Sequence, residues 1–82
     1  MHIVKVYGRD DCPDTQHALA YLDSIQVKHE YINIDEDIEG EEFVTAHNEG
    51  KRRVPTIDID GEILTEPSDS ELETALRERK LA

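Results

Sequence analysis

The stretch Ile-Val-Lys-Val-Tyr-Gly-Arg-Asp-Asp-Cys-Pro-Asp-Thr, residues 3–15, changes its pattern partway along. Residues 3–7 form a nearly continuous apolar run rich in β-branched side chains, which is typical of a short strand buried on both faces. From Pro13 onward, apolar side chains recur at helical spacing, and proline is tolerated in the first turn of a helix. The stretch therefore predicts a strand, a loop and a helix over about residues 13–24, with Cys12 directly before the helix.

Beyond this stretch, the sequence pattern predicts five further strands and helices. They are a strand over 27–34, a helix entered through 35–37 and ending near Gly50, a strand over 56–59, a strand over 62–64 and a helix over about 69–80. Asp60-Gly61 is a hairpin signal between the last two strands. Ser68 and Glu71 have capping-box spacing before the last helix. The order β-α-β-α-β-β-α predicts an α/β domain over residues 1–82, with a small mixed sheet of four strands flanked by three helices. This pattern does not fix the strand order.

Composition narrows the classes of partner. A formal charge of −11 disfavours nucleic acid and anionic membranes, because such polyanions would be repelled. One cysteine in 82 residues cannot form an internal disulfide, and no apolar run reaches membrane-spanning length. No basic-then-apolar leader opens the chain, so we expect a cytoplasmic protein. The four histidines and the cysteine show no zinc-ligand spacing, so no metal site is expected.

Cys12 is a candidate nucleophile because of its place before a helix. Unpaired N–H groups and the helix dipole stabilise a thiolate at such a position, and the thiolate is the reactive form of cysteine. Asp10, Asp11 and Asp14 act in the opposite direction, because nearby negative charges disfavour the thiolate, while Arg9 counters them. The alternative is that Cys12 is a small apolar residue that happens to precede a helix.

A second candidate segment is Arg52-Arg53-Val54-Pro55-Thr56, before the third strand. Proline at this position is consistent with a simple strand start. An X-Pro bond can also be cis, which would turn the preceding backbone outward to pair with an extended ligand.

Together these motifs resemble the glutaredoxin-type members of the thioredoxin superfamily. The resemblance rests on Val6-Tyr7, Cys12-Pro13-Asp14-Thr15, Val54-Pro55-Thr56 and Asp60-Gly61, in that order along nearly the whole chain. The segment 64–68, Leu-Thr-Glu-Pro-Ser, is more similar to mycoredoxin-like actinobacterial proteins than to standard glutaredoxins, which usually carry Gly-Gly there. The resemblance implies a thioredoxin-like fold and thiol-disulfide exchange.

It also implies roles for individual residues. Cys12 would be the nucleophile that attacks a mixed disulfide, and Val54 would present backbone groups beside a cis Pro55. The residues implied to bind the thiol ligand are Arg9, Pro13, Thr15, Arg52, Arg53, Val54, Pro55, Ser68 and Asp69. As alternatives, the arginines are solvated charges, Ser68 only caps the last helix, and Asp69 only complements its dipole.

Thr15 departs from the dithiol pattern of the family, which has a second cysteine at this position. A monothiol cycle remains available, in which a second free thiol releases the adduct from Cys12. We expect Thr15 to donate a hydrogen bond to the Cys12 sulfur. The expected co-substrate is a low-molecular-weight thiol such as glutathione or mycothiol, with no tightly bound cofactor. The expected partners are protein mixed disulfides, and the chain is expected to be a monomer. The alternatives are a non-catalytic thioredoxin-like binding module or an iron-sulfur-cluster carrier.

Overall fold

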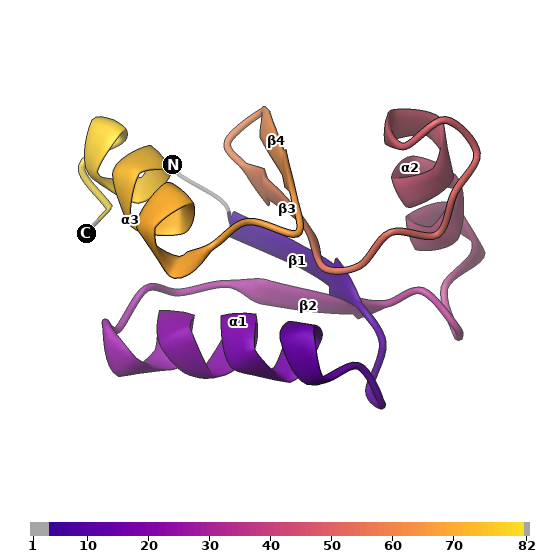
Figure 1. Cartoon of the computed structure of the whole chain (residues 1–82), viewed down its shortest axis with the longest axis horizontal. Coiled ribbons are helices and arrows are strands. Elements are labelled where there is room, and N and C mark those ends of the chain that lie inside the picture. Colours follow the sequence, from indigo (N-terminus) through magenta and orange to yellow (C-terminus); the bar gives the residue numbers. More distant parts are fainter. Residues whose placement is uncertain (1–3, 82) are drawn as a thin grey trace.

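The computed structural model describes residues 4–81, and its elements follow the predicted order (Figure 1). They are β1 (Val4–Gly8), α1 (Pro13–Ser24), β2 (Glu30–Asn33), α2 (Ile38–His47), β3 (Thr56–Ile59), β4 (Glu62–Thr65) and α3 (Asp69–Glu78). The bounds of α1 and β3 are as predicted. β1 extends one residue further to Gly8, and β2 is shorter than predicted. Ile3, which was predicted to lie in the first strand, is outside the described residues.

The sheet has the strand order β2-β1-β3-β4, which the sequence did not fix. β1 pairs in parallel with β2 and antiparallel with β3, so Tyr7 lies between Ile32 and Thr56. The β3–β4 hairpin turns at Asp60 and Gly61, both with positive φ, of 52° and 101°. Glycine adopts such angles without steric cost, and aspartate tolerates them better than most residues. Because β1 is central, the loop that follows it emerges from the middle of the sheet.

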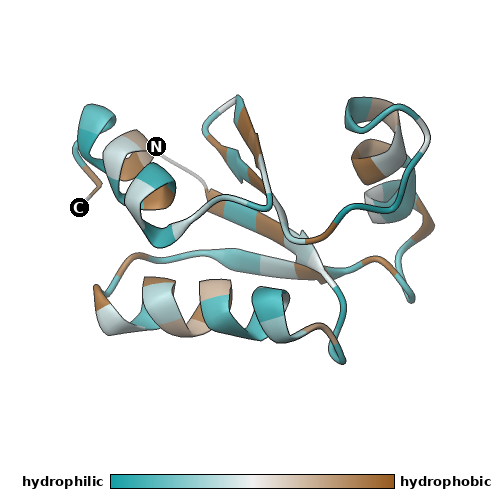
Figure 2. Cartoon of the chain, in the orientation of Figure 1, coloured by the Kyte–Doolittle hydropathy of each residue, from teal (hydrophilic) through white to brown (hydrophobic). Residues whose placement is uncertain are grey.

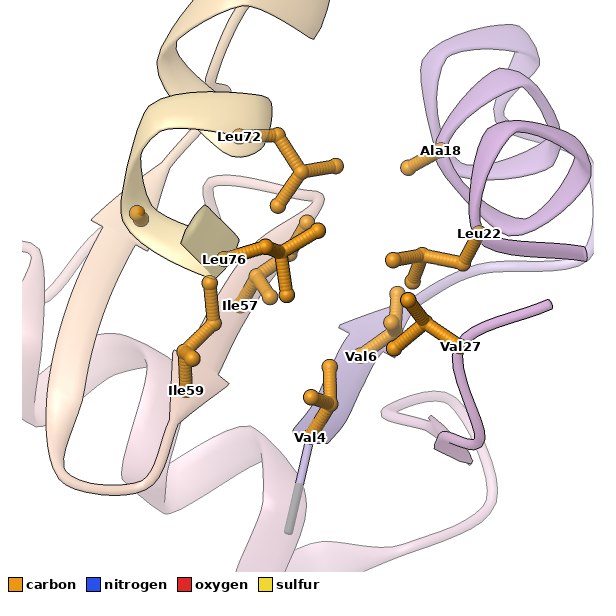
Figure 3. Packing of buried hydrophobic residues seen from close by; sticks show 10 residues of the cluster. Val4, Val6, Ala18, Leu22, Val27, Ile57, Ile59, Leu72 and Leu76 are labelled. Carbon is orange, nitrogen blue, oxygen red and sulfur yellow. The ribbon is translucent and has the colours of Figure 1, made fainter. Parts of the chain in front are cut away.

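The main core lies on the sheet face that α1 and α3 cover (Figure 3). Leu22 of α1 and Leu76 of α3 are fully buried and point toward each other over the inner strands. Burying a leucine side chain contributes about 1.5–3 kcal/mol. The buried members of this cluster are Val4, Val6, Ala18, Leu22, Val27, Ile57, Ile59, Leu72, Ala75 and Leu76.

The second core is smaller and lies under α2, on the other sheet face. Tyr7, Ile34 and Val44 are buried there. The ring of Phe43 stacks on Tyr7 with centroids 4.5 Å apart. The sheet is therefore covered on both faces, by α1 and α3 on one side and α2 on the other, as expected for a mixed sheet with parallel pairing.

The predicted helix starts are present in the structure. The Asp37 carboxylate accepts a hydrogen bond from Gly40 N at 2.9 Å. At α3, Glu71 N donates to Ser68 Oγ and Ser68 N donates to Glu71 Oε1, which completes the capping box. The hydrogen bond from the Ser68 backbone, and after it the Ser68 side chain, lowers the pKa of the Glu71 carboxyl. Figure 2 shows that the loop leading from β1 into α1 is largely hydrophilic, so this end of the sheet faces solvent.

Candidate active site

Cys12 is the N-cap residue of α1, as predicted. Its backbone is extended, with φ −94° and ψ 115°, and its thiol makes no capping hydrogen bond. Cys12 N donates to Arg9 O at 3.2 Å, which closes a tight turn at the end of the loop. Since Pro13 has no N–H, the first helical N–H groups without an intrahelical acceptor are those of Asp14 and Thr15. The side chain is half-buried and is a free thiol. Cys12 is thus held at a helix N-terminus and is partly exposed.

Val54 and Pro55 lie opposite the thiol. The Val54–Pro55 peptide bond is cis, and Pro55 is buried. The Cys12 sulfur lies 4.0 Å from the Val54 carbonyl oxygen, at the long limit for a hydrogen bond from a thiol. Among residues 4–81, no backbone partner is found for the Val54 N–H. The structure therefore brings the two predicted motifs together, with the Val54 carbonyl oxygen beside the sulfur.

Thr15 does not lie where the ligand-binding prediction placed it. Its side chain is fully buried, and its hydroxyl accepts a hydrogen bond from Arg9 N at 3.4 Å. The predicted hydrogen bond to the Cys12 sulfur is not found among the described residues, so this part of the prediction is wrong. The physical reason is helical geometry, since a residue three positions into α1 turns toward the sheet and packs on Gly8. Thr15 therefore packs beneath the loop between β1 and α1 and accepts a hydrogen bond from its backbone.

Two of the three aspartates around Cys12 have partners. Asp10 accepts a hydrogen bond from the Tyr31 hydroxyl at 2.7 Å. Asp11 lies 3.6 Å from the Arg9 guanidinium. Burial and the contact with Asp10 strongly raise the pKa of Tyr31, so it stays protonated as the donor. The Tyr31 contact was not predicted, because it joins a residue within β2 to the loop that follows β1, 21 positions earlier in the chain.

The arginines near the site are paired with carboxylates. Arg9 Nε donates to Asp35 Oδ2 at 3.0 Å, and Arg52 binds the other oxygen of the same carboxylate. Arg52 Nε also lies 2.8 Å from Glu41. Both arginines lower the pKa of Asp35, and the hydrogen bond from Arg52 is the largest single cause. Asp35 was not among the residues predicted for the site, since its importance appears only when the loops after β1 and β2 and the segment before Pro55 meet.

Arg53 and the start of α3 border the other side of the site. Arg53 pairs with Glu66 at 3.2 Å, and Glu66 follows β4. The Asp69 carboxylate accepts a hydrogen bond from the ring of His17 on α1, whose Nε2 lies 2.9 Å and 3.0 Å from its two oxygens. This pair connects α1 to α3 across the surface. His17 was not predicted to have a role at the site.

A cavity of about 250 Å³ lies between α1 and α3, beside the cis proline. Its wall combines the predicted Pro55, Ser68 and Asp69 with the acidic side chains of Asp14 and Glu66. The remaining lining residues are His17, Ala18, Pro67 and Leu72. The cavity is large enough for a small polar group, and its wall has an excess of negative charge.

Residues 4–81 contain neither a cluster of metal ligands nor a membrane-spanning helix. No group of three or more histidine, cysteine or acidic side chains is arranged to hold a metal ion in this part of the chain. None of the helices described is long and apolar enough to cross a membrane.

Comparison with solved structures defines the class of fold. The chain superimposes on the thioredoxin-like protein BC3987 with a TM-score of 0.77 at 22% identity, over 87% of this chain and 96% of that one. A glutaredoxin from Archaeoglobus fulgidus gives a TM-score of 0.74 at 24% identity, over 90% of this chain and 85% of that one. The chain has a thioredoxin-like α/β fold, with a thiol at the start of its first helix.

Sequence comparison then gives the family. The sequence model of the family described as glutaredoxin matches residues 4–64. Mycoredoxin 1 from Corynebacterium glutamicum is 36% identical over 73 residues, which cover 88% of this chain and 90% of the relative. The chain belongs to the glutaredoxin family of thiol-disulfide oxidoreductases.

Proposed function

We propose that this protein is a monothiol oxidoreductase that acts on mixed disulfides between proteins and a low-molecular-weight thiol. The observation that carries the proposal is the single free thiol of Cys12, which sits at the N-cap of α1 with the Val54 carbonyl oxygen 4.0 Å away. A disulfide that approaches this sulfur meets the Val54 N–H, which has no backbone partner among the described residues. Main-chain pairing of this kind orients an extended ligand independently of its side chains.

The proposed reaction has two exchange steps. In the first, the Cys12 thiolate attacks the small-thiol sulfur of a protein mixed disulfide. A new disulfide forms between Cys12 and the small thiol, and the protein leaves as a thiolate that takes up a proton. In the second, a free small thiolate attacks the small-thiol sulfur of the adduct and releases the Cys12 thiolate. One protein mixed disulfide is thus reduced to the protein thiol, and its small-thiol half leaves joined to the one incoming small thiol as the small-thiol disulfide. With Thr15 in place of a second cysteine, the chain cannot release the adduct by itself.

The remaining site residues have supporting roles in this proposal. Pro13 shapes the start of α1, and Pro55 holds the Val54 backbone beside the sulfur. The cavity beside Pro55, which Ser68 and Asp69 line, receives the far end of the small thiol. Arg9, Arg52 and Arg53 border the site in their ion pairs. We further propose a single catalytic domain over residues 1–82 that acts as a cytoplasmic monomer, with glutathione or mycothiol as co-substrate.

The test is mass spectrometry of the intact purified protein after incubation with oxidised glutathione or mycothiol disulfide. The expected result is one added half-disulfide on Cys12 with at least one of the two compounds, removed again by the matching free thiol. Mass and peptide mapping identify which compound reacts and at which residue.

Cys12→Ser is the matched control, because it keeps the size of the side chain and removes the sulfur. The variant should fold as the wild type does, by circular dichroism, and take up no half-disulfide. If the wild-type protein forms no adduct with either compound and is alkylated slowly across the pH range, the proposal that it is a monothiol oxidoreductase is wrong. That outcome would favour a non-catalytic binding module.

A further inference from the structure

The carboxylate of Asp35 is shared between two guanidinium groups beside the thiol. One oxygen binds Arg9, which is in the loop before Cys12, and the other binds Arg52, which is two residues before Val54. Arg9 is close enough to Cys12 for the sulfur to contribute to the raised pKa of its guanidinium. The Asp35 ion pairs therefore connect the two backbone segments that form the site.

Backbone hydrogen bonds place Asp35 there without any ligand. Ile34 N donates to Gly8 O at 2.9 Å, which extends the pairing of β2 with β1 beyond the last strand residue. Asp35 N then donates to the Asn33 side chain at 2.9 Å in a local turn. Since β1 leads directly into the loop with Arg9, Asp35 is fixed opposite Arg9 by the sheet itself.

The charges around these arginines are already balanced or exceeded by acids. Arg9 and Arg52 face three carboxylates, those of Asp11, Asp35 and Glu41. A free ligand carboxylate would have to displace Asp35, which is tethered and therefore present at high effective concentration. The arginine pairs lower the pKa of Asp35, so it keeps its charge at neutral pH.

We infer that Asp35 sets the charge preference of the Cys12 site, by occupying the guanidinium groups that would otherwise bind an anionic thiol ligand. The site then favours disulfides whose halves are neutral or cationic over those that carry net negative charge. The inference rests on the proposed function, because it concerns which disulfide reaches Cys12. Asp35 touches no reacting atom and acts through Arg9 and Arg52, so it is a positioning and specificity residue.

The test compares three disulfides of different charge with the wild type and with Asp35→Asn. Oxidised glutathione is anionic, bis(2-hydroxyethyl) disulfide is neutral and cystamine is cationic. The rate of adduct formation on Cys12 is measured for each by quenched mass spectrometry. Taking the ratio of variant to wild-type rate for each compound removes the intrinsic reactivity of the compounds.

Removal of one charge at a partly solvated site should raise the rate with oxidised glutathione about fivefold. The neutral compound should change less than about twofold, and cystamine should react more slowly.

Glu42→Gln is the matched control, since it removes the same charge from α2 one position beyond Glu41. Glu42 is exposed, and its side chain has no contact with either arginine among the interactions described. This variant should change all three rates equally. A second measurement uses the wild type alone, where added salt should raise the rate with oxidised glutathione relative to cystamine because it screens the site.

The outcomes separate the two proposals. If Asp35→Asn changes the three rates by the same factor, or if salt leaves the wild-type rates in a constant ratio, the inference is wrong while the proposed function stands. If none of the three disulfides forms an adduct on wild-type Cys12, the proposed function itself fails. Circular dichroism of Asp35→Asn establishes that the fold is retained.

Discussion

Thr15 fills the space that a side chain at residue 8 would need. A Cβ atom built on Gly8 would lie 2.4 Å from Thr15 Cγ2 and 2.5 Å from Thr15 Oγ1. β1 therefore ends in glycine because the first turn of α1 passes directly over it, and this close approach holds Cys12 above the end of the central strand.

Gly8→Ala should destabilise the protein by about 1–3 kcal/mol, because the added methyl group overpacks a fully occupied site. Thr15→Ala in the same chain should recover part of the loss, since it removes the two nearest atoms and leaves only a Cβ contact of 3.0 Å. Urea unfolding of both single variants and the double variant gives the coupling free energy. Equal costs of Gly8→Ala in the two backgrounds would show that the contact is not limiting.

Ser68→Ala should lower the free energy of unfolding by about 1 kcal/mol, because it removes the cap of α3. The two capping bonds, at 2.9 Å and 3.1 Å, are local to the helix start, so the loss should appear as faster hydrogen exchange in its first turn. The pKa of Glu71 should rise only part of the way toward its ordinary value, which NMR titration can follow, because the substitution keeps the backbone hydrogen bond from residue 68, the larger cause of the lowered pKa, and removes the side-chain one. Ser70→Ala, inside the same helix, is the control and should leave that pKa in place.

Tyr31 should ionise at a higher pH than a free tyrosine, whose pKa is about 10. Burial is the main cause, followed by the hydrogen bond to Asp10. Asp10→Asn should therefore lower the pKa of Tyr31 only part of the way. Ultraviolet absorbance titration of the wild type and of Tyr31→Phe isolates this residue by difference. An unchanged titration in Asp10→Asn would mean that the contact at 2.7 Å is not maintained in solution.

Asp35→Asn should reduce stability at neutral pH and have a diminishing effect in acid. The folded-state pKa of Asp35 lies below its usual value, because Arg52 and Arg9 bind the charged form. The stabilisation is therefore fully present above the unfolded-state pKa of about 3.9 and is lost as the pH falls through the lower folded-state value. Denaturant unfolding at a series of pH values measures the difference between variant and wild type. A difference that stays constant down to strong acid would argue against the ion pairs with Arg9 and Arg52.

Local patterns predicted most elements because their causes are local. The span of α1 was correct because Pro13 starts it and the apolar spacing of Ala18 and Leu22 continues it. The capping box of α3 depends on residues three positions apart. β2 was predicted too long, since the apolar Val27 is buried beneath α1 without joining the sheet. Periodicity reports burial, and burial alone does not establish strand pairing.

The site was predicted in part. Its two motifs were found, but the orientation of Thr15 was wrong, and the contacts of Asp35, Tyr31 and His17 were not foreseen. The contacts of Asp35, Tyr31 and His17 each join distant parts of the chain, as Arg9 with Asp35 and His17 with Asp69 show. In so acidic a sequence, the neighbours of a surface carboxylate along the chain do not indicate which arginine it will pair with.

The sequence by itself determined the order of the elements, the start of α1 directly after Cys12 and the hairpin at Asp60-Gly61, because capping, turn conformation and side-chain spacing act within a few residues. The tertiary structure alone decided that β1 lies between β2 and β3. That strand order brings Val54 to the Cys12 sulfur and Asp35 to both arginines. Such contacts arise from the burial of both sheet faces, a property of the whole chain that no single segment encodes.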